Sequence, residues 1–286
     1  MTAAELERRA ESVAAGLPSL FLRAKRLAAT VNAGAHGRRR PGSGDDFWQF
    51  RHSQPGDALT AIDWRQSAKS DHLYVREKEW TIAHTTRMWV DPSASMRWSQ
   101  SAQYEEKYAR ACLLAVAVGC LLEPTGERIG LLGHPGPTLV GRTAPIRLAL
   151  ALLAADRDDS WPSRPVPKKG TLLLFSDFLQ PLVAIEAGLK RWSAAGLSGH
   201  LLQILDPAEE SLPYAGRVRL RGLESEGETL LANAASLRAE YGRAVLDHRQ
   251  AVQSLARHYG WSFGLHHTDR PAREALTHLY AALARC

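Results

Sequence analysis

The chain has 286 residues, 45% apolar and 23% charged, which are the proportions of a globular protein with a buried core rather than of a disordered chain. Its net charge of +6 permits contact with nucleic acid or an anionic membrane surface. The densest basic patch, Arg38-Arg39-Arg40, is followed by Pro-Gly-Ser-Gly and has no aromatic side chains between its arginines. We therefore expect no nucleic-acid partner.

The apolar runs and the cysteines indicate a cytoplasmic protein. The longest apolar run, residues 111–122, is about a dozen residues long, against roughly 20 for a bilayer span, so it predicts a buried helix and no membrane span. The charged first nine residues lack the apolar core of a signal peptide. Cys112 and Cys120 lie too far apart on one predicted helix to form a disulfide, which suits a reducing compartment.

The N-terminal part is predicted to be helical first and β-rich afterwards. Apolar residues at helical spacing predict helices over residues 3–15 and 17–31. Between residues 45 and 80, an aromatic cluster, a Pro-Gly-Asp turn and a β-prone run at 73–77 indicate a small β-rich extension. We assign residues 1–84 to these N-terminal helices and extension, and residues 85–286 to the main domain.

The main domain alternates strands and helices. Strands are predicted over residues 86–90, 128–132, 138–140, 171–175, 200–205 and 262–266, and helices over residues 104–122, 145–155, 181–195, 234–259 and 271–284. Continuously apolar strands separated by helices predict an α/β fold with a doubly wound, mainly parallel sheet. Ligands bind such sheets at the carboxyl ends of the strands. Three predicted strands end there in an aspartate, Asp91, Asp177 and Asp206, and we expect at least two to converge.

A loop of alternating oxygen-bearing residues follows the first of these strands. Asp91, Ser93 and Ser95 carry ligand types that Mg²⁺ prefers in its octahedral shell. Asp177 is the expected second carboxylate and Thr143 the expected further hydroxyl, which leaves one coordination position for a carboxylate from outside. The alternative is that Asp91 and the two serines only cap the next helix and close a turn.

These motifs resemble known families. The Asp91-Pro-Ser-Ala-Ser loop and the Ser176-Asp177 strand end resemble the metal-ion-dependent adhesion site of von Willebrand factor A domains. Together with the upstream strings at 55–57, 62–69 and 73–77, they resemble domain-of-unknown-function family 58 over about residues 34 to 283. That resemblance implies a von Willebrand factor A-like domain of Rossmann-type topology, and an adaptor or co-chaperone of MoxR-type AAA+ ATPases without established enzymatic activity.

The predicted function is a non-enzymatic, Mg²⁺-dependent protein–protein interaction module. Asp63, Trp64 and Arg65 are predicted to belong to a partner-binding face; alternatively, a buried tryptophan and an Asp–Arg pair lock the extension onto the sheet. Two other functions remain open. One is Mg²⁺-dependent phosphoryl transfer by Asp91, although Ser93 stands where a second acid is expected. The other is nucleic-acid binding through the basic N-terminal region.

Overall fold

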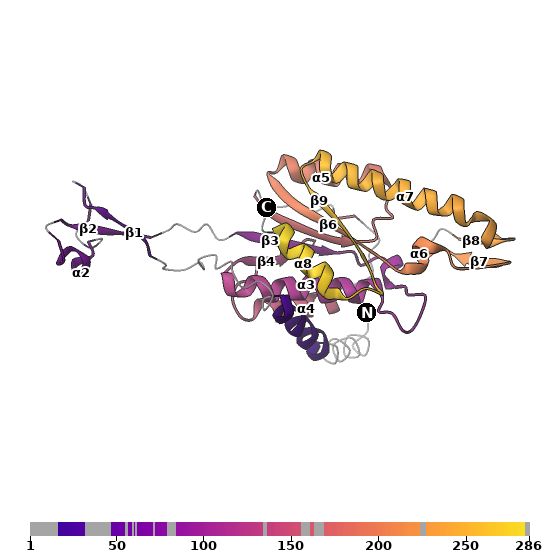
Figure 1. The fold of residues 1–286 in the computed structure, drawn as a ribbon, viewed down its shortest axis with the longest axis horizontal. Helices are drawn as coiled ribbons and strands as arrows, with labels where there is room; N and C mark the ends of the chain where they lie inside the picture. Colours follow the sequence, from indigo (N-terminus) through magenta and orange to yellow (C-terminus); the bar gives the residue numbers. More distant parts are fainter. Residues whose placement is uncertain are drawn as a thin grey trace.

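A computed structural model describes residues 17–31, 47–54, 57–58, 60, 62–70, 72–78, 84–133, 136–155, 161–162, 169–223 and 227–283. Its main domain alternates strands and helices as predicted (Figure 1). The elements from residue 85 onward are β3 (Thr85–Val90), α3 (Lys107–Leu122), β4 (Arg128–Leu131), α4 (Ala144–Leu153), β5 (Gly170–Ser176), α5 (Leu182–Ala194), β6 (Leu197–Leu205), α6 (Pro207–Ser211), β7 (Val218–Arg221), β8 (Glu228–Leu231), α7 (Ala234–His258), β9 (Ser262–His267) and α8 (Ala272–Leu283).

Five of these strands form one parallel sheet in the order β4-β3-β5-β6-β9. The chain moves outward from β3 to β4 and then crosses to β5 on the other side of β3. The strand order therefore reverses between β3 and β5, and a doubly wound sheet opens its binding crevice at the carboxyl ends of such a strand pair. The predicted fold class is confirmed.

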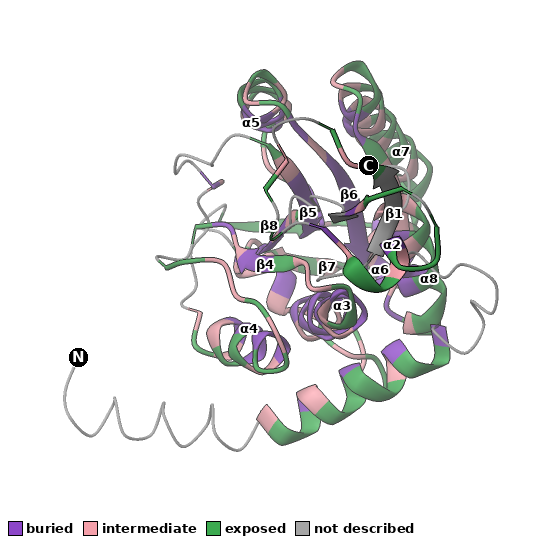
Figure 2. Ribbon diagram, turned by 90° about the vertical axis from the view of Figure 1, so that its left-hand side faces the viewer, coloured by how far each residue is buried: buried purple, intermediate pink, exposed green. Residues whose placement is uncertain are grey.

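Helices cover both faces of the sheet (Figure 2). The helix at residues 17–31 packs with α3, α4 and α8 on one face, and α5 and α7 pack on the other. Alternate side chains of β5 serve the two layers: Leu173 and Phe175 face α3, whereas Leu172 and Leu174 face α5. The middle of α3, residues 111–119, is buried on every side, so it lies at the centre of the first layer.

The N-terminal extension is built around a hairpin. β1 (Phe47–His52) pairs antiparallel with β2 (Tyr74–Lys78), and the short helix α2 (Trp64–Ser67) lies between them in the sequence. This agrees with the predicted β-rich character. The predicted helix at residues 3–15 and the basic run at 38–40 lie outside the described residues.

Some predicted elements differ from the structure. Residues 138–140 form an isolated bridge, Ile129 with Leu139, instead of a strand. Between β6 and α7 the structure adds the short helix α6, where the sequence indicates only irregular chain, and the hairpin β7–β8, which agrees with the β-prone run at 217–220. Short elements of four or five residues give a periodic pattern too little length to appear in the sequence.

Candidate functional site

The strand-end aspartates of β3 and β5 lie at the point where the strand order reverses. The backbone N–H of Asp91 donates to the carbonyl of Phe175 at 2.9 Å, which continues the pairing of the two strands to their tips. Both carboxylates are buried: Asp91 is 1% exposed and Asp177 is 0% exposed. The fold thus places two acids side by side, out of contact with bulk water.

A chain of hydrogen bonds joins these acids through the loop after β3. The N–H of Ser93 donates to Asp91 Oδ1 at 3.0 Å, and the hydroxyls of Ser93 and Ser95 lie 3.1 Å apart. The hydroxyl of Ser95 donates to Asp177 Oδ2 at 2.8 Å. The structure therefore brings together four of the five predicted ligand residues.

Two further side chains hold Asp91 in place. Its Oδ2 accepts from the Ser176 hydroxyl at 2.5 Å and from Gln180 Nε2 at 2.7 Å. Among the described residues, nothing hydrogen-bonds to the buried Oε1 of Gln180. A polar atom left without a partner at a buried position costs free energy unless a water or ligand satisfies it.

Backbone strain marks the same place. Phe178, the residue after Asp177, has a φ of 55° although it is not glycine, and its side chain is fully buried. The carbonyl oxygen of Phe178 lies 2.7 Å from Nε2 of His248. Strained conformations of this kind persist where the surrounding structure enforces them, and they cluster at functional sites.

Lys107 is part of the site, and the sequence did not indicate it. It is the first residue of α3 and is 0% exposed. Its ammonium donates to Asp177 Oδ2 at 2.8 Å and also to Glu209 of α6. Burial opposes the charge, but Asp177 and Glu209 outweigh it and raise the pKa of Lys107. A permanent positive charge therefore lies against the oxygen cluster.

Negative charge nevertheless exceeds positive charge here. Three buried or largely buried acids, Asp91, Asp177 and Glu209, face the one ammonium of Lys107. Burial, and after it the neighbouring charge of Asp177, raise the pKa of Asp91. In the described part of the chain, no three His, Cys, Asp or Glu side chains form a metal-binding group. A cation would rely on two carboxylates and serine hydroxyls, a hard-oxygen set that fits Mg²⁺.

The third strand-end aspartate, Asp206, has another role. Asp206 caps α6 by accepting from the N–H of Ala208 at 2.9 Å, and it also accepts from the N–H of Gln100 at 3.1 Å. It is buried at the same edge of the sheet but is not part of the hydrogen-bond chain from Asp91 to Asp177.

Thr143, the fifth predicted ligand, does not join the cluster. It is an exposed residue at the start of α4. Leu139 forms an antiparallel bridge with Ile129 of β4, and Ile129 pairs with Thr86 near the start of β3. Because the bridge is antiparallel, the chain after Leu139 continues toward the amino ends of the strands. Thr143 therefore lies at the opposite end of the sheet from Asp91.

Asp63, Trp64 and Arg65 lie at the start of α2. Asp63 is the N-cap, and its Oδ1 accepts from the N–H of Gln66 at 2.9 Å. Trp64 is 60% exposed and Arg65 is exposed. The alternative of a buried tryptophan is thus wrong, and the partner-binding role stays a prediction.

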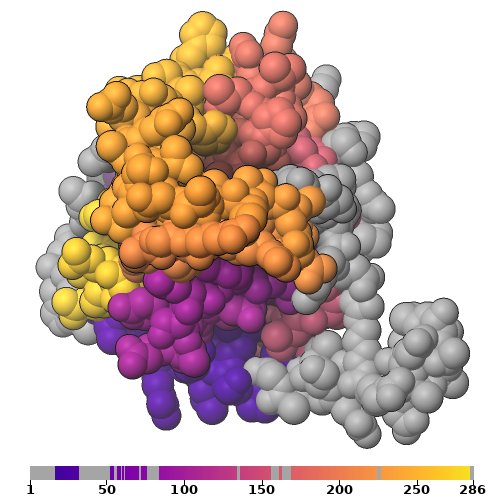
Figure 3. All heavy atoms as spheres, turned by 90° about the vertical axis from the view of Figure 1, so that its right-hand side faces the viewer, coloured from indigo at the N-terminus to yellow at the C-terminus, as the bar shows by residue number. Residues whose placement is uncertain are grey.

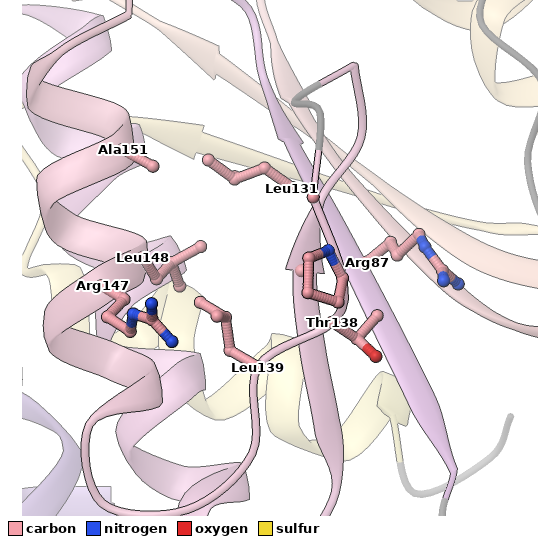
Figure 4. Close-up of a pocket in the computed structure, with 10 residues that line it drawn as sticks. Arg87, Leu131, Thr138, Leu139, Arg147, Leu148 and Ala151 are labelled. Carbon is pink, nitrogen blue, oxygen red and sulfur yellow. The ribbon is translucent and has the colours of Figure 1, made fainter.

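A pocket of about 240 Å³ lies elsewhere, between α4 and the edge strand β4 (Figure 4). Its lining includes the apolar side chains of Leu131, Leu139 and Leu148. Arg87 and Arg147 border it, but the Arg87 guanidinium points away from Arg147. The pocket includes none of the strand-tip oxygens, so it is separate from the candidate site.

Figure 3 shows the face at the carboxyl ends of the strands. The segment containing β7 and β8, drawn in orange, crosses this face beside the purple-to-magenta residues that follow β3. Two large apolar side chains near Asp177 are exposed, Leu179 at 57% and Val183 at 77%. The rim of the site thus offers apolar contact area beside its buried charges.

Two solved structures are similar to this chain. One is an aerotolerance-related membrane protein from Bacteroides fragilis, which is 12% identical with a TM-score of 0.41, covering 71% of this chain and 100% of that one. The other is the conserved hypothetical protein BatB from Bacteroides thetaiotaomicron, which is 11% identical with a TM-score of 0.33, covering 71% and 98%. The description of the first as a membrane protein contradicts the cytoplasmic location expected from the sequence, and that expectation is withdrawn.

One helix of the described residues, Lys107–Thr125, is long and apolar enough to cross a membrane by length and composition alone. It contains α3, and 67% of its apolar window is buried inside the fold. Its apolar character therefore serves the core of the main domain.

Sequence comparison places the chain in a family. Uncharacterized proteins of Mycobacterium bovis and Mycobacterium tuberculosis are each 29% identical over 282 residues, covering 90% of this chain and 86% of theirs. The model of a family described as "Protein of unknown function DUF58" matches residues 49–251, which is more than half of the chain. The strand-tip site and most of the extension lie inside this match, and the chain belongs to the DUF58 family.

Proposed function

We propose that this protein is a non-enzymatic interaction module that captures a partner protein through a Mg²⁺ ion held by Asp91, Ser93, Ser95 and Asp177. The observation that carries the proposal is the hydrogen-bonded chain of these four residues at the point where the strand order reverses. Thr143 is not included in the proposed ligand set, because it lies at the other end of the sheet.

The charges of the site support a divalent cation. Asp91, Asp177 and Glu209 together carry three negative charges against the one positive charge of Lys107, so the cluster can accommodate the two positive charges of a divalent cation. The four residues are too few to fill an octahedral shell of six, so open positions remain for water or a ligand from outside. When bound, the ion would supply an electrophilic contact for a carboxylate of the partner.

The chain's own residues would perform the rest of the recognition. Ser176 and Gln180 orient Asp91, and Lys107 orients Asp177. The exposed side chains of Leu179 and Val183 would give the partner apolar contact beside the charged centre. We propose a MoxR-type AAA+ ATPase, or a client protein that it handles, as the partner, in line with the family resemblance.

A capture experiment tests this function. The full chain is immobilised and incubated with a purified MoxR-type AAA+ ATPase from the same cell, in Mg²⁺ or in EDTA. We expect capture by the unaltered chain in Mg²⁺ and loss of capture in EDTA. We also expect loss in the variants Asp91→Ala and Asp91→Asn, because both remove a carboxylate ligand.

Asp269→Asn is the matched control, since Asp269 is an exposed aspartate just beyond the end of β9. It should capture the ATPase like the unaltered chain. Equal capture in Mg²⁺ and EDTA, with Asp91→Asn as active as the control, would refute the metal-dependent function. Metal-dependent hydrolysis of a generic phosphate ester that disappears in Asp91→Asn would favour the phosphoryl-transfer alternative instead.

A further inference from the structure

We infer that Lys107 is a built-in cation that competes with the divalent ion for Asp177, and that Glu209 sets the strength of this competition by drawing the ammonium away. The inference rests on the proposed cation site and assigns Lys107 and Glu209 roles as affinity-setting residues. Neither residue is a proposed ligand.

The geometry of Asp177 is the first argument. Its Oδ2 accepts from both the Ser95 hydroxyl and the Lys107 ammonium, each at 2.8 Å. The ammonium therefore shares a single oxygen with the proposed ligand cluster. A positive charge this close repels a second cation strongly, because the site is buried and poorly screened.

The burial of Lys107 is the second argument. A fully buried ammonium requires carboxylate partners, and Lys107 has two, Asp177 and Glu209. Glu209 is fixed independently of Lys107, because its Oε2 accepts from the N–H of Asp206 at 2.8 Å as part of the capping box of α6. Glu209 is thus a stationary second anchor, and the ammonium divides its attraction between the two carboxylates.

This arrangement predicts effects of opposite sign for two substitutions. Lys107→Met removes the competing charge, so Mg²⁺ affinity should rise by about tenfold or more. Glu209→Gln removes the second anchor and leaves the ammonium entirely to Asp177, so Mg²⁺ affinity should fall by about threefold or more. A purely structural role of the lysine would instead weaken binding in both variants.

Titration of the full chain with Mg²⁺ alone, followed by calorimetry, measures these affinities. Circular dichroism checks that each variant is folded. The double variant Lys107→Met/Glu209→Gln removes the buried pair together and guards against misfolding of the single variant; it too should bind Mg²⁺ more tightly than the unaltered chain. Lys190→Met, at an exposed lysine of α5, is the control and should leave the affinity unchanged.

The outcomes separate this inference from the proposed function. If the unaltered chain binds Mg²⁺ and neither Lys107→Met nor the double variant binds it more tightly, the inference fails and the proposed site stands. If only the variants lacking Lys107 bind Mg²⁺, the inference holds and the metal-dependent function of the unaltered chain fails. Absence of binding in every variant overturns both.

Discussion

The carboxylate of Asp91 accepts hydrogen bonds from Ser176, Gln180 and the N–H of Ser93, yet burial and the charge of Asp177 raise its pKa. An acid whose pKa is higher in the folded state than in the unfolded state lowers stability at every pH above those values. At neutral pH the ionised form of Asp91 therefore destabilises the metal-free protein.

Asp91→Asn should relieve this cost without losing the hydrogen bonds. The Ser176 hydroxyl can accept as well as donate, and Gln180 can turn its unsatisfied Oε1 toward the new amide. We expect the free energy of unfolding in EDTA at pH 7 to rise, because the amide carries no charge to bury beside Asp177. Urea denaturation measures it, with Asp269→Asn as the control that stays unchanged; a fall in stability would show that the repulsion is not significant.

Single residues also show how far the sequence predicts the site. Asp91, Ser93, Ser95 and Asp177 were predictable because strand-end positions in a parallel sheet share one edge. Lys107 was not, since a lysine at the start of an apolar helix normally reaches solvent. Its burial depends on Glu209, a partner 102 positions away that only the fold brings near.

At the scale of elements, β6 packs so tightly against its neighbours that one position admits no side chain. A Cβ atom at Gly199 would lie 2.4 Å from the carbonyl oxygen of Leu172 on β5 and 2.5 Å from the ring of Trp261. Both groups belong to the core between the sheet and the α5–α7 layer, so neither can withdraw freely.

Gly199→Ala should therefore destabilise the protein by about 3 kcal/mol, through displacement of Trp261 and distortion of the β5–β6 pairing. Chemical denaturation followed by tryptophan fluorescence measures this loss. Gly242→Ala in α7 is the matched control, because a Cβ there meets nothing within 4 Å and helix propensity favours alanine by about 0.5–1 kcal/mol. Equal stability of the two variants would contradict the packing argument.

Element length explains which parts of the fold were predictable. The long helix α7 has a clear helical period, and the buried strand β5 is continuously apolar. The sequence therefore predicts both elements to within one or two residues of their ends. The hairpin β7–β8 has strands of only four residues, and α6 has five. The position of α6 depends on its capping box and on the hydrogen bond from Tyr241 of α7 to the carbonyl of Glu209, and the second of these is a contact that the local sequence does not reveal.

At the scale of the whole molecule, the doubly wound sheet keeps the apolar core apart from the candidate site at the strand tips. The apolar layers on either side of the sheet pack against the parallel strands β3 and β5, so their tips can carry buried charges that cost stability. Elsewhere in the described domain, burial favours the neutral form of several ionisable side chains. Two histidines are the clearest case.

His200 on β6 and His266 on β9 are each 4% exposed, and burial lowers the pKa of both to about 4. Nearby positive groups add to this effect: His278 for His200, and Arg110, His267 and His278 for His266. In the unfolded chain both imidazoles should titrate near 6.5. Since the unfolded state then binds more protons, stability is full above about pH 6.5 and is lost as the pH falls toward 4.

Between pH 7.5 and pH 5 we expect each histidine to cost about 2 kcal/mol of unfolding free energy, measured by urea denaturation in EDTA. His200→Gln should remove roughly half of this pH dependence, because an amide cannot titrate. His258→Gln, at an exposed position, should leave it unchanged. Asp91 has the opposite effect on stability. Because its pKa is raised in the folded protein, its protonation at lower pH favours the folded state. A stability that stays level from pH 7.5 to 5 would therefore mean that water reaches the two imidazoles in the folded protein.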